Sequence, residues 1–289
     1  MKKKIKEILS RPSHWHMVGD GFRVYNYFPS GYPISDHMNP FLMLDFNPEF
    51  HFEPSTSPRG VGVHPHKGFE TVTIAYQGVV AHHDSAGHSG IIRPGEVQWM
   101  TAGSGILHKE YHEAEFSKSG GAFEMIQLWV NLPKAFKNLK PDYQAITLEN
   151  RCVWFSQKSS SYVHVIAGSF NKLTAKTRTC SVMDVWDLHI IKDTLSFKVP
   201  EGRHSSCLVV KGQPEINGSK LKPQDFVLFE HSGVDLEIFS ESESIVLWLS
   251  GEPINEPVVQ YGPFVMNTRQ EINEAMEAFH SGAFGYLED

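Results

Sequence analysis

Short alternating segments, separated by Gly, Pro, Asp and Asn, recur through most of this 289-residue chain and determine which fold class it can adopt. Residues 71–76 are the clearest example, because Val72, Ile74 and Tyr76 share one face of an extended strand before Gly78 ends it. Similar segments occur at 125–130, 163–166, 207–210, 225–229 and 244–249. No helical segment follows each strand, as a parallel α/β fold would require. The sequence therefore predicts an all-β protein of the sandwich or barrel type.

The chain is long enough for two domains of about 150 residues each. Between its halves, a basic stretch bounded by two prolines interrupts the succession of strands, and we interpret it as an interdomain connection. The predicted organisation is an N-terminal barrel over residues 1–133, a linker over 134–142, a second barrel over 143–258 and an extension over 259–289.

One helix is predicted, in the C-terminal extension. Thr268 and Glu271 have the spacing of a capping box, in which each side chain accepts a hydrogen bond from a backbone N–H at the helix start. The apolar residues that follow have the i, i+3, i+4, i+7 spacing of one helix face; they are Ile272, Ala275, Met276 and Phe279. Gly282 marks the expected end. A single amphipathic helix must bury its apolar face, so we expect this helix to pack on one of the barrels.

Composition excludes several classes of function. The chain's 26 basic and 33 acidic residues give a net charge of −7, which disfavours direct binding to nucleic acid. Its longest apolar runs are far shorter than the roughly 18 residues that cross a bilayer, and residues 1–11 lack the apolar core of a secretory signal. We therefore expect no membrane contact and a cytoplasmic location. The three cysteines form no CxxC pair, so neither a disulfide framework nor a thiolate zinc site is expected.

Two short motifs in the first half place metal-binding side chains two residues apart. They are His64-Pro65-His66 and His108-Lys109-Glu110. On a strand, residues i and i+2 point to the same face with Cα atoms about 6.6 to 7 Å apart, so two such pairs on neighbouring strands would aim four ligands into one barrel. Three imidazoles and one carboxylate suit Fe, Mn, Cu, Ni or Zn. Four protein ligands would leave an octahedral metal two open positions, which is typical of a catalytic site.

Other polar residues receive different roles. Glu70 lies four residues after His66, but Gly68 interrupts the strand between them, so Glu70 is predicted to hold a ligand imidazole by its free N–H. Three further histidines fall in a turn-rich stretch and are predicted to be solvated; they are His82, His83 and His88. In the second half, His204 has no ligand two residues later, and the second barrel is predicted to lack a metal.

Longer motifs around the histidine pairs resemble the signature of the pirin family. The most specific stretches are residues 64–73 and 94–110, and the similarity extends to residues 39–46, 126–133 and 256–268. The resemblance implies a bicupin, with two antiparallel β-barrels and iron in the N-terminal one. Matched residue by residue, it places Fe(II), with Mn, Ni, Cu or Zn as alternatives, on His64, His66, His108 and Glu110.

The resemblance also implies a function. Bacterial pirin-like proteins are associated with quercetin 2,3-dioxygenase activity, in which O2 opens the heterocycle of a flavonol and carbon monoxide leaves. In such a reaction Glu110 is the expected base for the substrate hydroxyl proton.

Two other functions stay open. Pirins are also associated with regulation, in which an iron-bearing domain senses redox state and binds a transcription factor or a metabolic enzyme. A zinc cupin isomerase acting on a sugar phosphate would need Lys or Arg in its pocket, whereas the nearby Lys67 and Lys109 alternate away from the ligand face.

Overall fold

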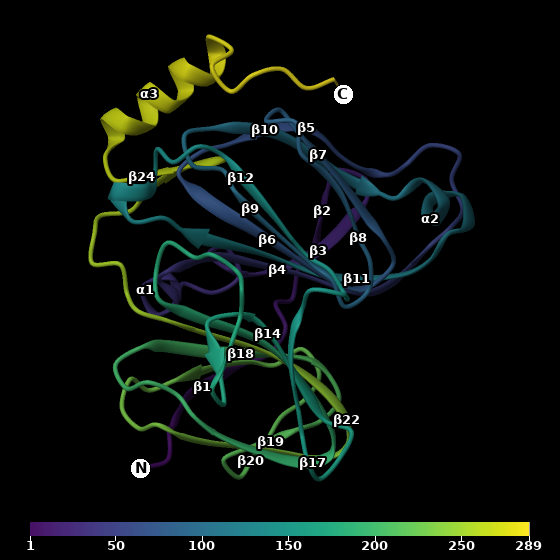
Figure 1. Ribbon diagram of the computed structural model, residues 1–289, viewed down its shortest axis with the longest axis vertical. Coiled ribbons are helices and arrows are strands. Elements are labelled where there is room, and N and C mark those ends of the chain that lie inside the picture. Colours follow the sequence, from purple (N-terminus) through teal and green to yellow (C-terminus); the bar gives the residue numbers. More distant parts are fainter. Residues whose placement is uncertain (289) are drawn as a thin grey trace. The chain divides into compact units, whose positions relative to one another are not determined.

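Antiparallel β-strands dominate the computed structural model, which describes residues 1–288 (Figure 1). The chain divides into two compact units, each of which is formed from several segments. The N-terminal unit comprises Pro12–Pro33, Phe41–Leu148 and residues 254–288, and the C-terminal unit comprises Met1–Arg11, Ile34–Pro40 and Glu149–Pro253. The predicted all-β class is confirmed, although the sheets are open rather than closed barrels.

The N-terminal unit contains two larger sheets. One has four strands in the order β5-β10-β7-β8, and the other has seven in the order β12-β9-β6-β11-β4-β3-β2. The strands are β2 (His16–Val18), β3 (Phe22–Phe28), β4 (Phe41–Phe52), β5 (Gly60–His66), β6 (Phe69–Gln77), β7 (Val80–Asp84), β8 (Ser89–Ile92), β9 (Val97–Thr101), β10 (Ile106–His112), β11 (Gly121–Asn131) and β12 (Asp142–Ile146). Two short helical segments connect strands; they are α2 (Ala114–Ser119) and the 3-10 turn η1 (Lys134–Phe136).

Apolar side chains from both sheets of the N-terminal unit share one core. Val24 and Phe123 come from the seven-stranded sheet, and Val80 and Ile92 come from the four-stranded sheet. The two sheets therefore pack face to face, as expected for a jelly roll.

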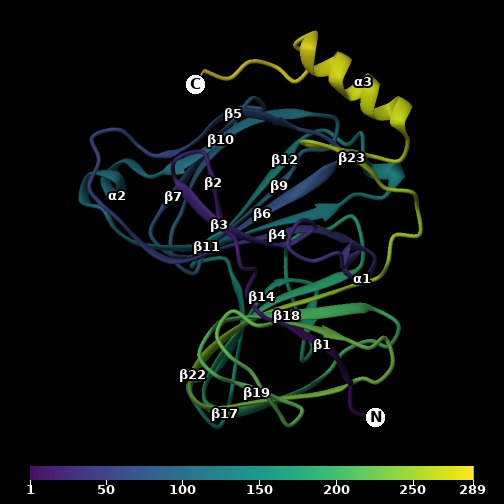
Figure 2. The same ribbon diagram turned by 180° about the vertical axis from the view of Figure 1, so that it is seen from behind.

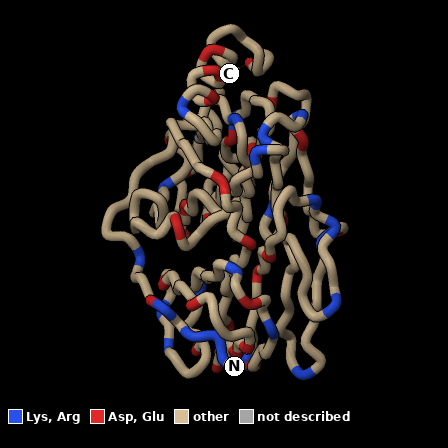
Figure 3. Tube along the Cα trace, turned by 90° about the vertical axis from the view of Figure 1, so that its left-hand side faces the viewer, with Lys and Arg blue, Asp and Glu red and all other residues tan. Residues whose placement is uncertain are grey.

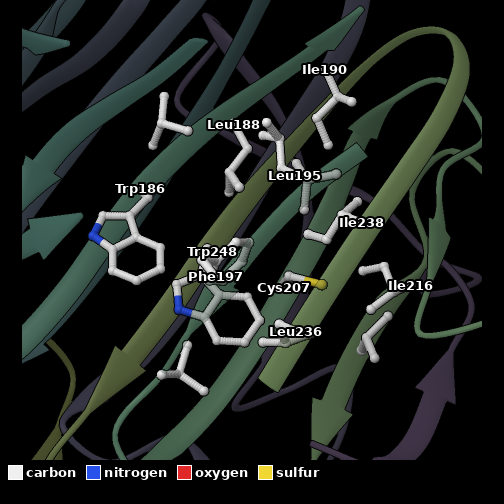
Figure 4. Close-up of a cluster of buried hydrophobic side chains, with 14 of the residues drawn as sticks. Trp186, Leu188, Ile190, Leu195, Phe197, Cys207, Ile216, Leu236, Ile238 and Trp248 are labelled. Carbon is white, nitrogen blue, oxygen red and sulfur yellow. The ribbon is translucent and has the colours of Figure 1, made fainter. Parts of the chain in front are cut away.

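The C-terminal unit is built around one nine-stranded sheet, whose main path runs β1-β21-β18-β22-β17-β14-β13. Its elements are β1 (Ile5–Leu9), α1 (Ser35–Met38), β13 (Cys152–Phe155), β14 (Tyr162–Ala167), β15 (Ser169–Phe170), β16 (Leu173–Thr174), β17 (Met183–Lys198), β18 (His204–Lys211), β19 (Glu215–Ile216), β20 (Ser219–Lys220), β21 (Phe226–Phe229) and β22 (Asp235–Gly251). Trp186, Phe197 and Trp248 pack together in its core, which also buries Cys207 (Figure 4). Burial raises the pKa of the Cys207 thiol, which therefore behaves as a small apolar side chain.

The boundaries of the two units differ from the predicted ones. β1 pairs with β21 and lies in the C-terminal unit, whereas the predicted linker, residues 134–142, lies in the N-terminal unit. Within this stretch the buried ammonium of Lys137 donates hydrogen bonds to Gly68 O and Asn131 Oδ1, both at 2.8 Å, and to Val265 O at 2.9 Å. These bonds tie the stretch to three other segments of the same unit, which explains why it packs there.

The predicted C-terminal helix is α3 (Arg269–His280), and it begins with the predicted capping box of Thr268 and Glu271. Its buried residues, Ile272 and Ala275, pack against the hairpin of β23 (Val259–Tyr261) and β24 (Phe264–Met266). Leu107 of β10 belongs to the same apolar cluster. Figure 2 shows α3 along the outside of the N-terminal unit, next to β23. The helix thus covers this unit beside the strand that carries His108.

Charged residues of both signs are intermixed along the trace in Figure 3, apart from a basic run near the N-terminal end. This mixture of signs agrees with the net charge of −7. Over residues 1–288, none of the helices has both the length and the apolar character that a bilayer span requires.

Candidate metal centre

Three neighbouring strands of the four-stranded sheet carry the candidate ligands. β10 lies between β5 and β7 and pairs with both in antiparallel register. In this register His108 is opposite His64 on β5 and opposite Asp84 on β7. Two residues further along β10, Glu110 is opposite His82 on β7. The two sequence motifs therefore meet because the strands that contain them are hydrogen-bonded neighbours.

The three imidazoles of His64, His66 and His108 form a compact cluster. Their ring centroids are 4.9 Å apart for the first pair, 4.2 Å for His64 and His108, and 4.7 Å for His66 and His108. One nitrogen from each ring lies within 4.8 Å of a nitrogen of both others. Nδ1 of His64 is 2.8 Å from the carbonyl oxygen of Gly62, so Nδ1 is the donor, and in the neutral ring the lone pair is on Nε2.

Two nitrogens of this cluster are buried without a partner among the described residues. They are Nδ1 of His66 and Nε2 of His108. Burial lowers the pKa of both imidazoles well below its usual value, so both rings are neutral at neutral pH. Buried polar atoms are normally hydrogen-bonded, and an unshared lone pair in such a place is a donor for a cation. The residues present therefore fit a bound metal ion.

Glu110 does not join all three imidazoles in one compact group. Its carboxylate clusters instead with His82 and His108, with ligand atoms within 4.8 Å of one another. The hydroxyl of Thr73 is 3.0 Å from Oε1 of Glu110 and donates to it. The four predicted ligands thus fall into two overlapping groups that share His108, and Glu110 belongs only to the group that contains His82.

His82, predicted to be solvated, is instead fully buried. It lies in β7, where Val80, His82 and Asp84 point inward and His83 is exposed. The ring of His82 stacks on Tyr143, with centroids 5.2 Å apart. The period-two alternation of residues 80–84 was the sequence signal for this arrangement, and the turn-forming residues that follow obscured it.

A chain of hydrogen bonds runs from Asp84 through His82 to His108. Burial opposes ionisation of Asp84, but hydrogen bonds from the His82 ring and the His88 backbone outweigh it and lower its pKa. The ionised carboxylate can only accept, so Nε2 of His82, 3.3 Å from Asp84 Oδ2, is the donor. Nδ1 of His82 faces the amide nitrogen of Gln98, which can only donate, so Nδ1 is an acceptor, and it lies 3.4 Å from Nδ1 of His108. The distance from Gln98 Nε2 to this acceptor is 3.3 Å.

This chain assigns the tautomer of His108. Its proton is placed on Nδ1, facing His82, and its lone pair on Nε2, which has no other partner among residues 1–288. Metal-binding histidines commonly donate their second N–H to such a partner.

Glu70, predicted to hold a ligand imidazole, has a different partner. Gly68 has a φ of +84°, and it separates β5 from β6, which begins at Phe69. Oε1 of Glu70 accepts a 2.7 Å hydrogen bond from Thr101. Burial raises the pKa of Glu70 to about 7. In the described part of the chain, His82 contacts the His108 ring in this way and the carbonyl oxygen of Gly62 contacts the His64 ring, whereas Glu70 has Thr101 as its partner.

In the C-terminal unit, His204 lies near two other histidines. Its Nδ1 donates to Asn39 O at 2.7 Å, and its ring centroid is 4.9 Å from that of His231 and 6.5 Å from that of His37. These rings are not among the metal-competent groups of residues 1–288. The absence of a metal from this unit stays a prediction.

A cavity of about 390 Å³ opens beside the imidazole cluster, between the two sheets of the N-terminal unit. His64, His66 and Glu110 form part of its wall on the four-stranded sheet. Most of the remaining lining is apolar, with a few polar side chains from β4 and β11; it consists of Val18, Phe22, Val24, Met43, Asp45, Asn47, Val61, Met125, Gln127, Trp129 and Pro263. Ligand sites are typically concave and apolar in this way, with a few convergent polar groups.

Two antiparallel β units and a histidine cluster inside one of them define a protein of the bicupin class. The family model named pirin matches residues 21–130, and the model named pirin C-terminal cupin domain matches residues 185–285. The chain therefore belongs to the pirin family.

A solved structure and two curated sequences are similar to this chain over nearly its whole length. A crystal structure of quercetin 2,3-dioxygenase from Acinetobacter baumannii is 42% identical, with a TM-score of 0.93 and 100% of both chains covered. Pirin from Rattus norvegicus is 36% identical over 99% of this chain and 94% of its own. A pirin-like protein from Solanum lycopersicum is 34% identical over 98% and 92%, respectively.

Proposed function

We propose that this chain is a metal-dependent dioxygenase of the quercetin 2,3-dioxygenase type, which opens the heterocycle of a flavonol with O2 and releases carbon monoxide. The observation that carries the proposal is the convergence of imidazoles and a carboxylate on one wall of a mostly apolar cavity. The cavity volume, about 390 Å³, suits a flat molecule of flavonol size. The similarity to the Acinetobacter baumannii dioxygenase supports the same reaction.

The proposed cofactor is Fe(II), held by His64, His66 and His108, with Glu110 as a fourth ligand. When bound, such an ion would supply the Lewis-acid and redox chemistry that lets a flavonol react with O2. The same nitrogen and oxygen donors also suit Mn, Ni, Cu and Zn.

Glu110 is the proposed base for the proton of the flavonol 3-hydroxyl. The Thr73 hydroxyl contacts Oε1 of this carboxylate, so Oε2 would bind the metal and would take the proton once its bond to the metal loosens. The aromatic and thioether side chains of Phe22, Met43 and Trp129 line the cavity and would pack against the rings of the substrate while excluding water.

The proposal is tested by loading the purified protein separately with Fe(II), Mn(II), Ni(II), Cu(II) or Zn(II) and measuring flavonol absorbance, O2 uptake and carbon monoxide. We expect at least one loaded form to turn over. The variant His108→Ala should lose both metal and turnover. His83→Ala, at an exposed position on the neighbouring strand, should retain both.

The absence of carbon monoxide from every loaded form would refute the enzymatic proposal. Capture of a protein partner that depends on the Fe(II) or Fe(III) state would then support the regulatory alternative. The cavity between the sheets favours the enzyme, because a docking role needs an exposed surface instead.

A further inference from the structure

The inward-facing residues of β4 and β11 form three cross-strand rows in the lining of the cavity. The antiparallel register pairs Met43 with Trp129, Asp45 with Gln127, and Asn47 with Met125, and all six side chains line the cavity. Positions i, i+2 and i+4 of a strand share one face, so these rows follow directly from the register. We call these six residues the cavity floor.

Two of the three polar side chains in the cavity floor already have protein partners. Asp45 Oδ1 accepts a 2.7 Å hydrogen bond from the side-chain amide of Asn26. Gln127 Oε1 lies 2.8 Å from the hydroxyl of Thr73, whose single proton is shared between this oxygen and Glu110 Oε1. These two side chains are therefore held in place by neighbours outside the floor.

Asn47 differs from both. Its side chain is only 2% exposed, and neither Oδ1 nor Nδ2 has a hydrogen-bond partner among residues 1–288. A buried amide with both ends unpaired destabilises a folded chain, and native proteins rarely keep one without a reason. Because Asn47 lines the cavity, a bound molecule can supply the missing partner.

We propose that Asn47 recognises a second hydroxyl group on an aromatic substrate, distinct from the hydroxyl presented to the imidazole cluster. The inference rests on the function proposed above and makes the substrate class more specific: neutral, flat and polyhydroxylated. An amide offers one acceptor and one donor side by side, which matches a phenolic hydroxyl that both donates and accepts.

The remaining lining of the cavity supports this class over an anionic one. Among the residues that the structure describes, it contains no Lys or Arg, whereas Asp45 and Glu110 contribute carboxylates, so an anionic group bound away from the proposed metal would meet no counter-charge. Phe22 and Trp129 provide aromatic surface for the rings of the substrate. Away from the proposed metal, this lining therefore favours a neutral aromatic substrate over a sugar phosphate.

The test compares two flavonols that differ only in whether the pendant phenyl ring carries hydroxyl groups. Their dissociation constants are measured by tryptophan fluorescence with the protein as purified, under nitrogen so that no turnover occurs. We expect the wild type to prefer the hydroxylated flavonol by about 5- to 30-fold, because the other leaves the Asn47 amide unpaired. Asn47→Leu should abolish the preference, and Asn273→Leu, a control at an exposed amide of α3 outside the cavity, should retain it.

Stability provides an independent measurement on the same variants. Without ligand, Asn47→Leu should melt at or above the wild-type temperature, because it removes an unpaired buried amide. A marked drop in melting temperature would instead assign Asn47 a structural role and overturn the inference. Equal binding of both flavonols by the wild type, or a preference that survives in Asn47→Leu, would also overturn it.

Turnover by the metal-loaded wild type is measured separately with both flavonols. If the preference depends on Asn47 but neither flavonol is oxidised, the proposed function fails and the recognition role stands. If both are oxidised without any effect of Asn47 on binding, only the recognition role fails.

Discussion

Removing the His82 ring should weaken metal binding even though His82 is not one of the proposed ligands. Nδ1 of His82 lies 3.4 Å from Nδ1 of His108 and accepts a hydrogen bond from it, while Nε2 of His82 donates to Asp84. In His82→Leu the N–H of His108 loses this acceptor in a fully buried place. The imidazole is then free to turn or to change tautomer, and either change removes the Nε2 lone pair from the cluster.

The expected loss of metal affinity follows from the effect of similar contacts to ligand histidines in other metal sites. Removing one typically lowers metal affinity about 10- to 100-fold, which corresponds to about 1.4–2.7 kcal/mol. The affinity is measured by competition between the metal-free protein and a chromogenic chelator for Zn(II), which is stable in air. His82→Gln should recover part of the loss because its amide oxygen can accept from His108. His83→Leu, at the exposed neighbouring position on β7, should bind Zn(II) like the wild type.

Two results would refute this reasoning. Wild-type affinity in His82→Leu would show that the contact with His108 does not position the ligand. Complete loss of binding, equal to that in His108→Ala, would show that His82 is itself a ligand, as its grouping with His108 and Glu110 would allow.

Three further predictions follow from the site and its surroundings. Glu110→Gln should keep the affinity for Zn(II) within about 100-fold of wild type. Flavonol turnover by the metal-loaded variant should fall by about 10²- to 10⁴-fold, because the amide cannot take the proton of the substrate hydroxyl. Single-turnover measurements of flavonol absorbance check this. Glu70→Gln should stabilise the metal-free protein, and the gain in unfolding free energy should grow to about 3 kcal/mol as the pH rises from 4.5 to 7. Burial raises the pKa of the wild-type Glu70 carboxyl to about 7, so the native wild type loses stability over this range. Urea unfolding at several pH values measures the gain, and a gain independent of pH would contradict the prediction. Lys137→Met should lower the free energy of unfolding by about 3 kcal/mol, because three buried oxygens lose their hydrogen-bond donor. Urea unfolding measures the loss. The control variant Lys140→Met, at an exposed position, should have nearly the wild-type urea midpoint.

The amino-acid sequence by itself was sufficient for features that depend on a few adjacent residues. Period-two alternation predicted the all-β class, and the capping box with its apolar stripe predicted α3. The His64–His66 and His108–Glu110 pairs were visible for the same reason, because residues two apart on a strand share a face whatever the strand pairs with. Metal binding by these residues stays a prediction.

Only the tertiary structure decided which strands are neighbours and in what register. That choice placed β1 in the C-terminal unit and residues 134–142 in the N-terminal one. It also set His82 against His108 and grouped Glu110 with His82, although the motifs alone suggested a single set of four. Strand partners are selected by the burial of side chains distant in sequence, so a local pattern shows which face a residue occupies but not what it will meet there.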